Sequence, residues 1–182
     1  LILLKEGLTK ALFLKKNMIR EMQMKYIIFC FIIIFSSKLF AADDLFVMGD
    51  KAFNGKANCA FCHGIFGDGK GHPRSPGIAA NLRKTQLDEE MLTEVLNCGI
   101  PGKAMPFFNR KAYKDPSICW DTVFEDYEQE DKPKKSEKTL SDQKLKAVVY
   151  YILNNFKDRG KVTKAECEEK FGSNHKLCNK YD

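Results

Sequence analysis

Two cysteines and a histidine stand within five positions of each other, Cys59, Cys62 and His63, in the stretch CAFCH. Three kinds of site use such residues: a structural zinc site, a thioredoxin-type pair of redox thiols, and a covalently attached haem. The three differ in what the rest of the chain must supply. A zinc site needs two further ligands, and a thioredoxin-type pair is expected beside a βαβ unit.

The rest of the chain favours the haem. The other two histidines, His72 and His175, read as ordinary loop histidines, and no βαβ pattern is visible. The cysteines that follow the motif do not form a second close pair; they are Cys98, Cys119, Cys167 and Cys178. Haem attachment gives every residue of the motif a role, because the two thiols form thioethers with the porphyrin vinyl groups and His63 binds the iron. The motif therefore predicts one covalently bound haem c.

Met105 is the candidate for the second axial ligand of the iron. It lies in GIPGKAMPFF, residues 99–108, a Gly- and Pro-rich loop that can arch over the other face of a haem. Met48 and Met91 are on expected helices, where methionine more often fills the core. With side chains at both axial positions no substrate reaches the iron, which favours electron transfer over O₂ binding or peroxide chemistry. A thioether ligand also raises the reduction potential.

Four further side chains are expected to crowd the haem together with Met105, limiting water and tuning the potential. They are Phe61 and Ile65 beside the motif, and Pro106 and Phe107 beside the methionine.

Residues 24–41 have the features of a bacterial signal peptide. An apolar run from Tyr26 to Phe35 follows a lysine, and a small-residue cleavage site ends at Ala41 or Ala42. The run is shorter than the roughly 20 residues that span a bilayer, so we expect cleavage and a periplasmic protein, with a retained membrane anchor as the alternative. Residues 1–23 precede this signal and are interpreted as an over-extended gene start, with a translated upstream extension as the alternative.

Removal of the leader changes the charge of the chain. Of the 30 Lys and Arg residues, seven lie in residues 1–41 together with two of the 24 acids, so 23 bases and 22 acids remain. A nearly neutral domain offers no basic face, and nucleic acid is therefore not expected as a partner.

The cysteines outside the motif are expected to form disulfides, because an exported chain meets an oxidising compartment. If Cys59 and Cys62 hold the haem, four cysteines remain, and these allow three pairings. The choice nearest in sequence is Cys98–Cys119 with Cys167–Cys178.

Helical periodicity predicts three helices, at about 44–53, 85–98 and 141–156. Thr85 and Asp88 resemble a capping box at the start of the second helix, and Gly99 suits its end. No strand-length alternation is visible, so the fold class is all-α.

The helices divide the exported part into a domain at 42–160 and a cysteine-containing extension at 161–182. Residues 121–138 change from acidic to basic and read as a solvated loop, with a docking surface as the alternative.

In this order the motifs resemble a class I, single-haem c-type cytochrome. The matching pieces are GDKAF (49–53), CAFCH (59–63), KAMPFF (103–108) and LKAVVYYI (145–152). The resemblance implies the cytochrome c fold, a few helices wrapped round one haem, here with a long loop insertion between Phe107 and Ser141.

The same resemblance implies two particular contacts. The first and last helices cross in this family, so Gly49 and Phe53 should meet Tyr150 or Tyr151. A proline carbonyl after the haem motif accepts a hydrogen bond from the proximal imidazole, and Pro76 is favoured over Pro73 for this role.

The insertion and the extension are similar to those of periplasmic cytochromes that accept electrons from PQQ-dependent alcohol dehydrogenases, especially methanol-oxidising ones. This implies a dehydrogenase as donor and a terminal oxidase or another cytochrome as acceptor. Trp120, in SICW, is interpreted as a buried anchor of the insertion, with a place beside the haem or at a docking surface as alternatives. The alternative function is a sensor or enzyme-associated haem subunit with a labile distal ligand.

Overall fold

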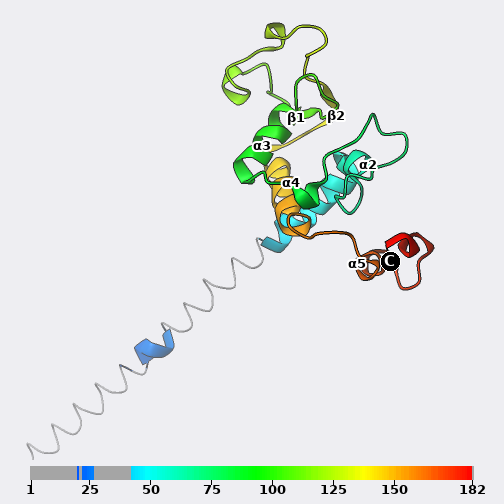
Figure 1. Ribbon diagram of the computed structural model, residues 1–182. Helices are drawn as coiled ribbons and strands as arrows, with labels where there is room; N and C mark the ends of the chain where they lie inside the picture. Colours follow the sequence, from blue (N-terminus) through cyan, green and yellow to red (C-terminus); the bar gives the residue numbers. More distant parts are fainter. Residues whose placement is uncertain (1–19, 21, 27–41, 182) are drawn as a thin grey trace, which may run out of the picture. The chain divides into compact units, whose positions relative to one another are not determined.

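The computed structural model describes residues 20, 22–26 and 42–181 (Figure 1). Most of the expected signal peptide and of the upstream extension lies outside these residues. Within the described part, no helix combines the length and the apolar character needed to cross a membrane. The chain divides into two compact units, Leu1–Asp43 and Asp44–Asp182. In the first unit residues 20 and 22–26 are helical and exposed, and the candidate site lies in the second.

The second unit is mostly helical, as expected. A helix at residues 42–51 crosses the unit boundary and continues into the π-helical turn η1 (Ala52–Lys56). The α-helices that follow are α2 (Cys59–His63), α3 (Glu89–Cys98), α4 (Asp142–Asn155) and α5 (Lys164–Phe171). The 3₁₀ turns are η2 (Leu82–Lys84), η3 (Pro116–Ile118), η4 (Phe124–Asp126) and η5 (Lys176–Tyr181). Two short strands, β1 (Phe107–Asn109) and β2 (Lys135–Leu140), complete the unit.

The three expected helices are all present, with one boundary corrected. Helix α4 matches the prediction, with Ser141 and Phe156 as its caps. Helix α3 begins four residues later than expected, because Asp88 and not Thr85 caps it. The Asp88 carboxylate accepts from the Met91 N–H at 2.9 Å. The Thr85 hydroxyl accepts from the Leu87 N–H at 3.2 Å and so closes a turn ahead of the helix.

The expectation that the chain contains no strand is wrong. Strands β1 and β2 pair in parallel, with Phe107 opposite Lys135 and Asn109 opposite Leu140, and the register shifts between these pairs. Strand β1 has only three residues, too few for an alternating pattern to stand out in the sequence. Strand β2 takes up the end of the segment 121–138, whose acidic residues are exposed.

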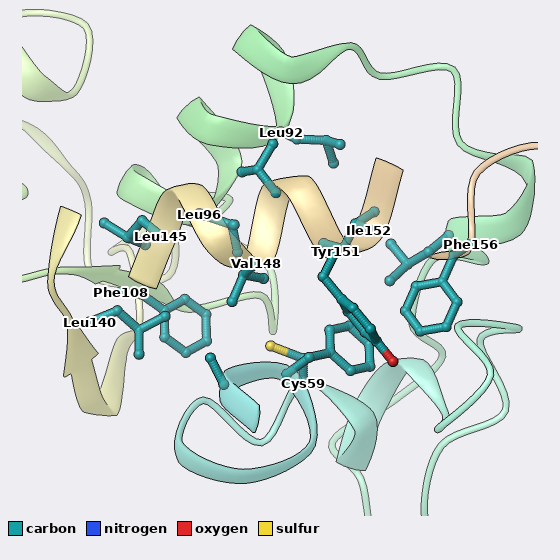
Figure 2. Packing of buried hydrophobic residues seen from close by; sticks show 14 residues of the cluster. Cys59, Leu92, Leu96, Phe108, Leu140, Leu145, Val148, Tyr151, Ile152 and Phe156 are labelled. Atoms are coloured by element: carbon teal, nitrogen blue, oxygen red, sulfur yellow. The ribbon is translucent and has the colours of Figure 1, made fainter. Parts of the chain in front are cut away.

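The predicted crossing of the first and last helices is confirmed. Gly49 lies against α4 so closely that a Cβ there would be 2.5 Å from the Cβ of Tyr151. Phe53 packs on the same tyrosine with a ring-centroid distance of 5.6 Å, and on Phe156 at 5.0 Å. Figure 2 shows Tyr151 and Phe156 in the main core, which also contains Phe53 and Cys59. The absence of a side chain at Gly49 is what lets the two helix backbones approach.

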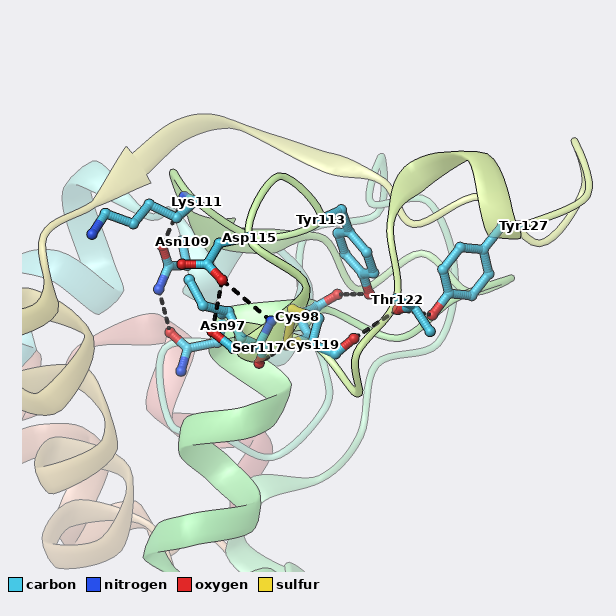
Figure 3. Close-up of a disulfide and its surroundings, with 11 residues drawn as sticks. Asn97, Cys98, Asn109, Lys111, Tyr113, Asp115, Ser117, Cys119, Thr122 and Tyr127 are labelled. Atoms are coloured by element: carbon cyan, nitrogen blue, oxygen red, sulfur yellow. Dashed lines mark hydrogen bonds between the residues drawn. A yellow bond between two sulfur atoms is a disulfide. The ribbon is translucent and has the colours of Figure 1, made fainter.

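Both predicted disulfides are confirmed. Cys98 and Cys119 are bonded across 5.6 Å between their Cα atoms, and Cys167 and Cys178 across 5.4 Å. Around the first bond, Tyr113 donates to the Cys98 carbonyl at 2.7 Å and Thr122 to the Cys119 carbonyl at 2.6 Å (Figure 3). The insertion is therefore bound to the end of α3 through covalent and polar contacts.

The disulfides lead to a prediction about thiol reactivity. A haem-free chain that begins at residue 42 should present two free thiols, of which Cys62 should react readily and the more deeply buried Cys59 only slowly. The haem-loaded protein should present none. Alkylation without reducing agent, followed by peptide mass spectrometry, measures both results. Labelling of Cys167 or Cys178 would contradict the pairing.

Candidate functional site

Helix α2 is a single turn that places the two cysteines of the motif on one side. It begins after Asn58, whose left-handed backbone (φ 54°, ψ 35°) ends the preceding π-helical turn; asparagine tolerates this conformation better than most residues. Residues three apart in a helix share a face, so Cys59 and Cys62 are neighbours on the helix surface. His63 follows at the last helical position.

The two cysteines are free thiols in different surroundings. Cys59 is buried in the main core, where Figure 2 shows its sulfur pointing toward α4, whereas Cys62 is half-buried. Burial raises the pKa of the Cys59 thiol to about 12, and it also raises the pKa of Cys62. A raised thiol pKa disfavours a thioredoxin-type redox pair, because the thiolate is the nucleophile in such a site. The residues the structure describes also contain no group of three or more His, Cys, Asp or Glu suited to a metal ion.

The His63 imidazole has a defined orientation. Its Nδ1 lies 2.9 Å from the carbonyl oxygen of Ala80. Because a carbonyl can only accept, Nδ1 must carry the proton, and Nε2 is left as the free nitrogen in the neutral ring. Burial lowers the pKa of this histidine and so favours the neutral form. A neutral imidazole that donates one N–H to the backbone is the usual state of a metal-ligating histidine.

The carbonyl that accepts the hydrogen bond from the His63 imidazole was expected to be that of Pro76. In the structure it is the carbonyl of Ala80. The segment after α2 returns to the motif through two backbone bonds, from His72 N to Phe61 O at 2.7 Å and from Leu82 N to Gly67 O at 2.8 Å. The second bond brings the carbonyl of Ala80 to the ring. Sequence reasoning missed Ala80 because any residue supplies the same carbonyl oxygen.

Met105 is half-buried and packs against the same core as Cys59. Its loop closes on the end of α3, where the Ile100 N–H donates to the Met105 carbonyl at 3.1 Å. Gly99 makes this closure possible: its φ is +66°, and a Cβ there would lie 2.7 to 2.9 Å from backbone atoms of residues 105–107. The structure thus gathers Met105 and Cys59 around one apolar core.

Phe107, which is predicted to crowd the haem, belongs to a cluster in the insertion and not to the main core. It packs in the insertion cluster, edge-on to Tyr113 at 5.4 Å and to Phe124 at 5.9 Å. Phe108 takes the place in the main core instead, because successive side chains of β1 point to opposite faces. Pro106, between Met105 and β1, is half-buried.

Phe61 and Ile65 are also placed away from the main core. Phe61 stacks on His72 with a centroid distance of 5.2 Å, and Ile65 packs in the cluster of the C-terminal extension. Both line a groove of about 540 Å³ on the outer side of α2, whose other wall includes Phe171 and Tyr181. Neither the motif residues Cys59, Cys62 and His63 nor Met105 line it. For Phe61 the one-turn helix explains the placement, since this residue lies between the two cysteines and points away from their face.

Trp120 is not the buried anchor of the insertion. It is 49% exposed and has a left-handed backbone, φ 55°. The anchors are aromatic residues that the sequence analysis did not single out: Tyr113, which is 3% exposed, with Phe124 and Tyr127 packed around it.

Comparison with protein families gives a match for the part of the chain that carries the site. Residues 49–120 match the family described as cytochrome c oxidase, cbb3-type, subunit III. The match includes Gly49, the haem motif and Met105, whereas α4 and the C-terminal extension lie beyond it. Searches of curated proteins and of solved structures gave no match. Residues 49–120 of this mostly helical chain are thus similar to a cytochrome c domain of the cbb3 oxidase subunit III-like family, and this similarity supports covalently bound haem c and electron transfer.

Proposed function

We propose that this protein is an exported, single-haem cytochrome c that carries one electron at a time between larger redox proteins. The observation that carries the proposal is the donor set on α2. Two free thiols one helical turn apart stand next to an imidazole whose Nδ1 is engaged by Ala80, which leaves Nε2 for the iron. The proposed cytochrome domain spans residues 42–160, and residues 161–182 form its extension.

Each ligand has a proposed role. Cys59 and Cys62 would hold the haem through thioethers, and His63 and Met105 would be the protein ligands of its iron. The bound haem supplies the one-electron chemistry. The chain orients His63, surrounds the site with the apolar core of Phe53, Phe108 and their neighbours, and reduces the access of water. With no open axial position, the protein is an electron carrier rather than an enzyme.

The compartment and the partners are also proposals. Two disulfides are typical of an oxidising compartment, which supports the periplasm. The family match names an oxidase subunit, and this supports a terminal oxidase or another cytochrome as the electron acceptor. A dehydrogenase that depends on PQQ is the proposed donor, on the resemblance of the insertion and the extension. Reduction of the purified cytochrome by such a dehydrogenase with methanol or another alcohol, followed by absorbance, tests the donor.

The presence of a covalently bound haem is tested by extraction of the pigment. The protein, secreted by a host that attaches haem c, should be red and should keep its pigment in the polypeptide through acid–acetone extraction. Because each thioether is a covalent bond, Cys59→Ala together with Cys62→Ala should release all of the pigment into the solvent. Colourless secreted protein, or pigment lost from the unmodified chain, would refute the proposal.

A labile distal ligand, as in a haem sensor, is distinguished by carbon monoxide. The reduced native protein should show no spectral change with CO, because Met105 fills the sixth position. Rapid CO binding by the native protein would favour the sensor over the carrier.

A further inference from the structure

Arg83 is a charged side chain in an almost fully buried position, 2% exposed. Its guanidinium faces Glu166, whose two carboxylate oxygens accept at 2.7 and 2.9 Å. The Nε donates to the carbonyl of Gly160 at 2.7 Å. Three further carbonyls lie at 3.1 to 3.4 Å from the terminal nitrogens: Phe66, Arg159 and Lys161. Such a bidentate pair with satisfied donors has one well-defined geometry.

Arg83, the first partner of this ion pair, is connected through the backbone to the residue that binds the His63 ring. Arg83 stands three residues after Ala80, the residue whose carbonyl accepts from the imidazole. Two hydrogen bonds hold residues 81–83 in place. The Arg83 N–H donates to the Asn81 side chain at 2.9 Å, and the Leu82 N–H donates to the Gly67 carbonyl. The guanidinium also reaches the carbonyl of Phe66, three residues after the imidazole. Arg83 therefore connects the segment that contains Ala80 with the segment that follows His63. These two segments meet at the His63 imidazole.

Glu166, the second partner, belongs to the C-terminal extension, which lies beyond the family match. Glu166 is on α5, next to Cys167 of the second disulfide. Phe66 is buried in the same cluster and packs edge-on to Tyr181 at 5.7 Å and to Phe171 at 6.1 Å. The extension is thus attached to the loop after the haem motif by an ion pair and by aromatic contacts, and its own disulfide links two of its residues.

We infer that Arg83 and Glu166 are positioning residues through which the C-terminal extension holds the Ala80 carbonyl on His63 and so lowers the reduction potential. The inference rests on the proposed function. A hydrogen bond from Nδ1 to a fixed acceptor makes the imidazole a more basic ligand. A more basic ligand stabilises the oxidised iron, which carries the larger positive charge. When the pair is broken, the carbonyl is held less firmly and the potential rises.

The test uses the full-length holoprotein and three variants. Glu166→Gln and Arg83→Lys both break the bidentate pair, and the second does so without changing net charge. Glu169→Gln is the control, because it makes the same charge change on an exposed position of the same helix. Reduction potential is measured by redox titration, and the solvent exchange of the His63 Nδ1 proton by NMR of the reduced protein.

Both pair variants should shift the redox equilibrium about tenfold toward the reduced form, about 59 mV for a one-electron couple. They should also speed up the exchange of the ring proton about tenfold, while the control changes neither. A pair variant that lowers thermal stability but leaves potential and exchange unchanged would show a structural role alone and overturn the inference. An equal shift in Glu169→Gln would overturn it as well. If Arg83→Lys does not fold, the reduction potential and the proton exchange of Glu166→Gln test the inference. A chain that acquires no haem refutes the proposed function first, and the inference with it.

Discussion

Replacing Met105 by alanine is expected to remove the long-wavelength methionine-to-iron band of the oxidised protein. The reduction potential should fall by a sizeable part of the roughly 0.8 V that axial ligands span in haem proteins, since the thioether favours the reduced iron. The haem should stay attached, because its other proposed bonds are on α2 and Met105 is in a separate loop. Near-infrared absorbance and redox titration measure the two effects, and the reduced variant should now bind CO.

Met91→Ala is the matched control for this experiment. Met91 is 39% exposed on α3, away from the buried positions of that helix, so its loss should leave both the band and the potential unchanged. An unchanged spectrum in Met105→Ala would mean that another side chain occupies the sixth position. The ligand assignment would then be wrong, while the covalent attachment would still stand.

Gly99→Ala is expected to destabilise the protein and to displace the loop that carries Met105. The φ of +66° with ψ −159° is a backbone conformation that is essentially restricted to glycine, and it costs another residue about 1 to 3 kcal/mol. The added Cβ would lie 2.7 to 2.9 Å from the backbone of residues 105–107, and relief of such overpacking costs about 1 to 3 kcal/mol more. We therefore expect a loss of about 2 to 6 kcal/mol in the free energy of unfolding, measured by urea titration, and a weaker methionine band.

Gly160→Ala separates the cost of the positive φ from the cost of the close contact that an added Cβ makes. Gly160 has nearly the same φ, +68°, but nothing lies within 4 Å of the position of its Cβ. Its substitution should cost only the backbone part, about 1 to 2 kcal/mol, and should leave the methionine band intact. If Gly99→Ala is no more costly than Gly160→Ala, then the close approach of the methionine loop to the end of α3 is not maintained in solution.

Helix α2 has two sides with different surroundings. The side with Cys59 faces the main core, and the side with Phe61 faces the groove beside the C-terminal extension. Phe61 and Ile65, which are predicted to crowd the haem, line this groove together with Phe171 and Tyr181 of the extension. The ion pair of Arg83 and Glu166 shows where the extension contacts the rest of the second unit.

Local chemistry determined much of this protein from the sequence alone. The spacing of Cys59, Cys62 and His63 predicted the haem motif, because thiols and imidazole at those positions fit few other sites. The apolar stripe of residues 141–156 predicted α4 to within a residue or two, since one helical face packs on the core. The two disulfides followed from the choice of the nearest partners in an oxidising compartment. Each of these inferences depends on side chains that are close together in the chain.

The tertiary structure decided the points at which several residues were chemically equivalent. Pro76 and Ala80 offer the same carbonyl oxygen, and only the closure of the loop onto Gly67 selects Ala80. Phe107 and Phe108 offer the same ring, and only the pairing of β1 with β2 determines which one enters the main core. Arg83 and Glu166 are 83 positions apart, and no local pattern connects them. Long-range packing makes these choices, because it acts on distances in space that the order of residues does not contain.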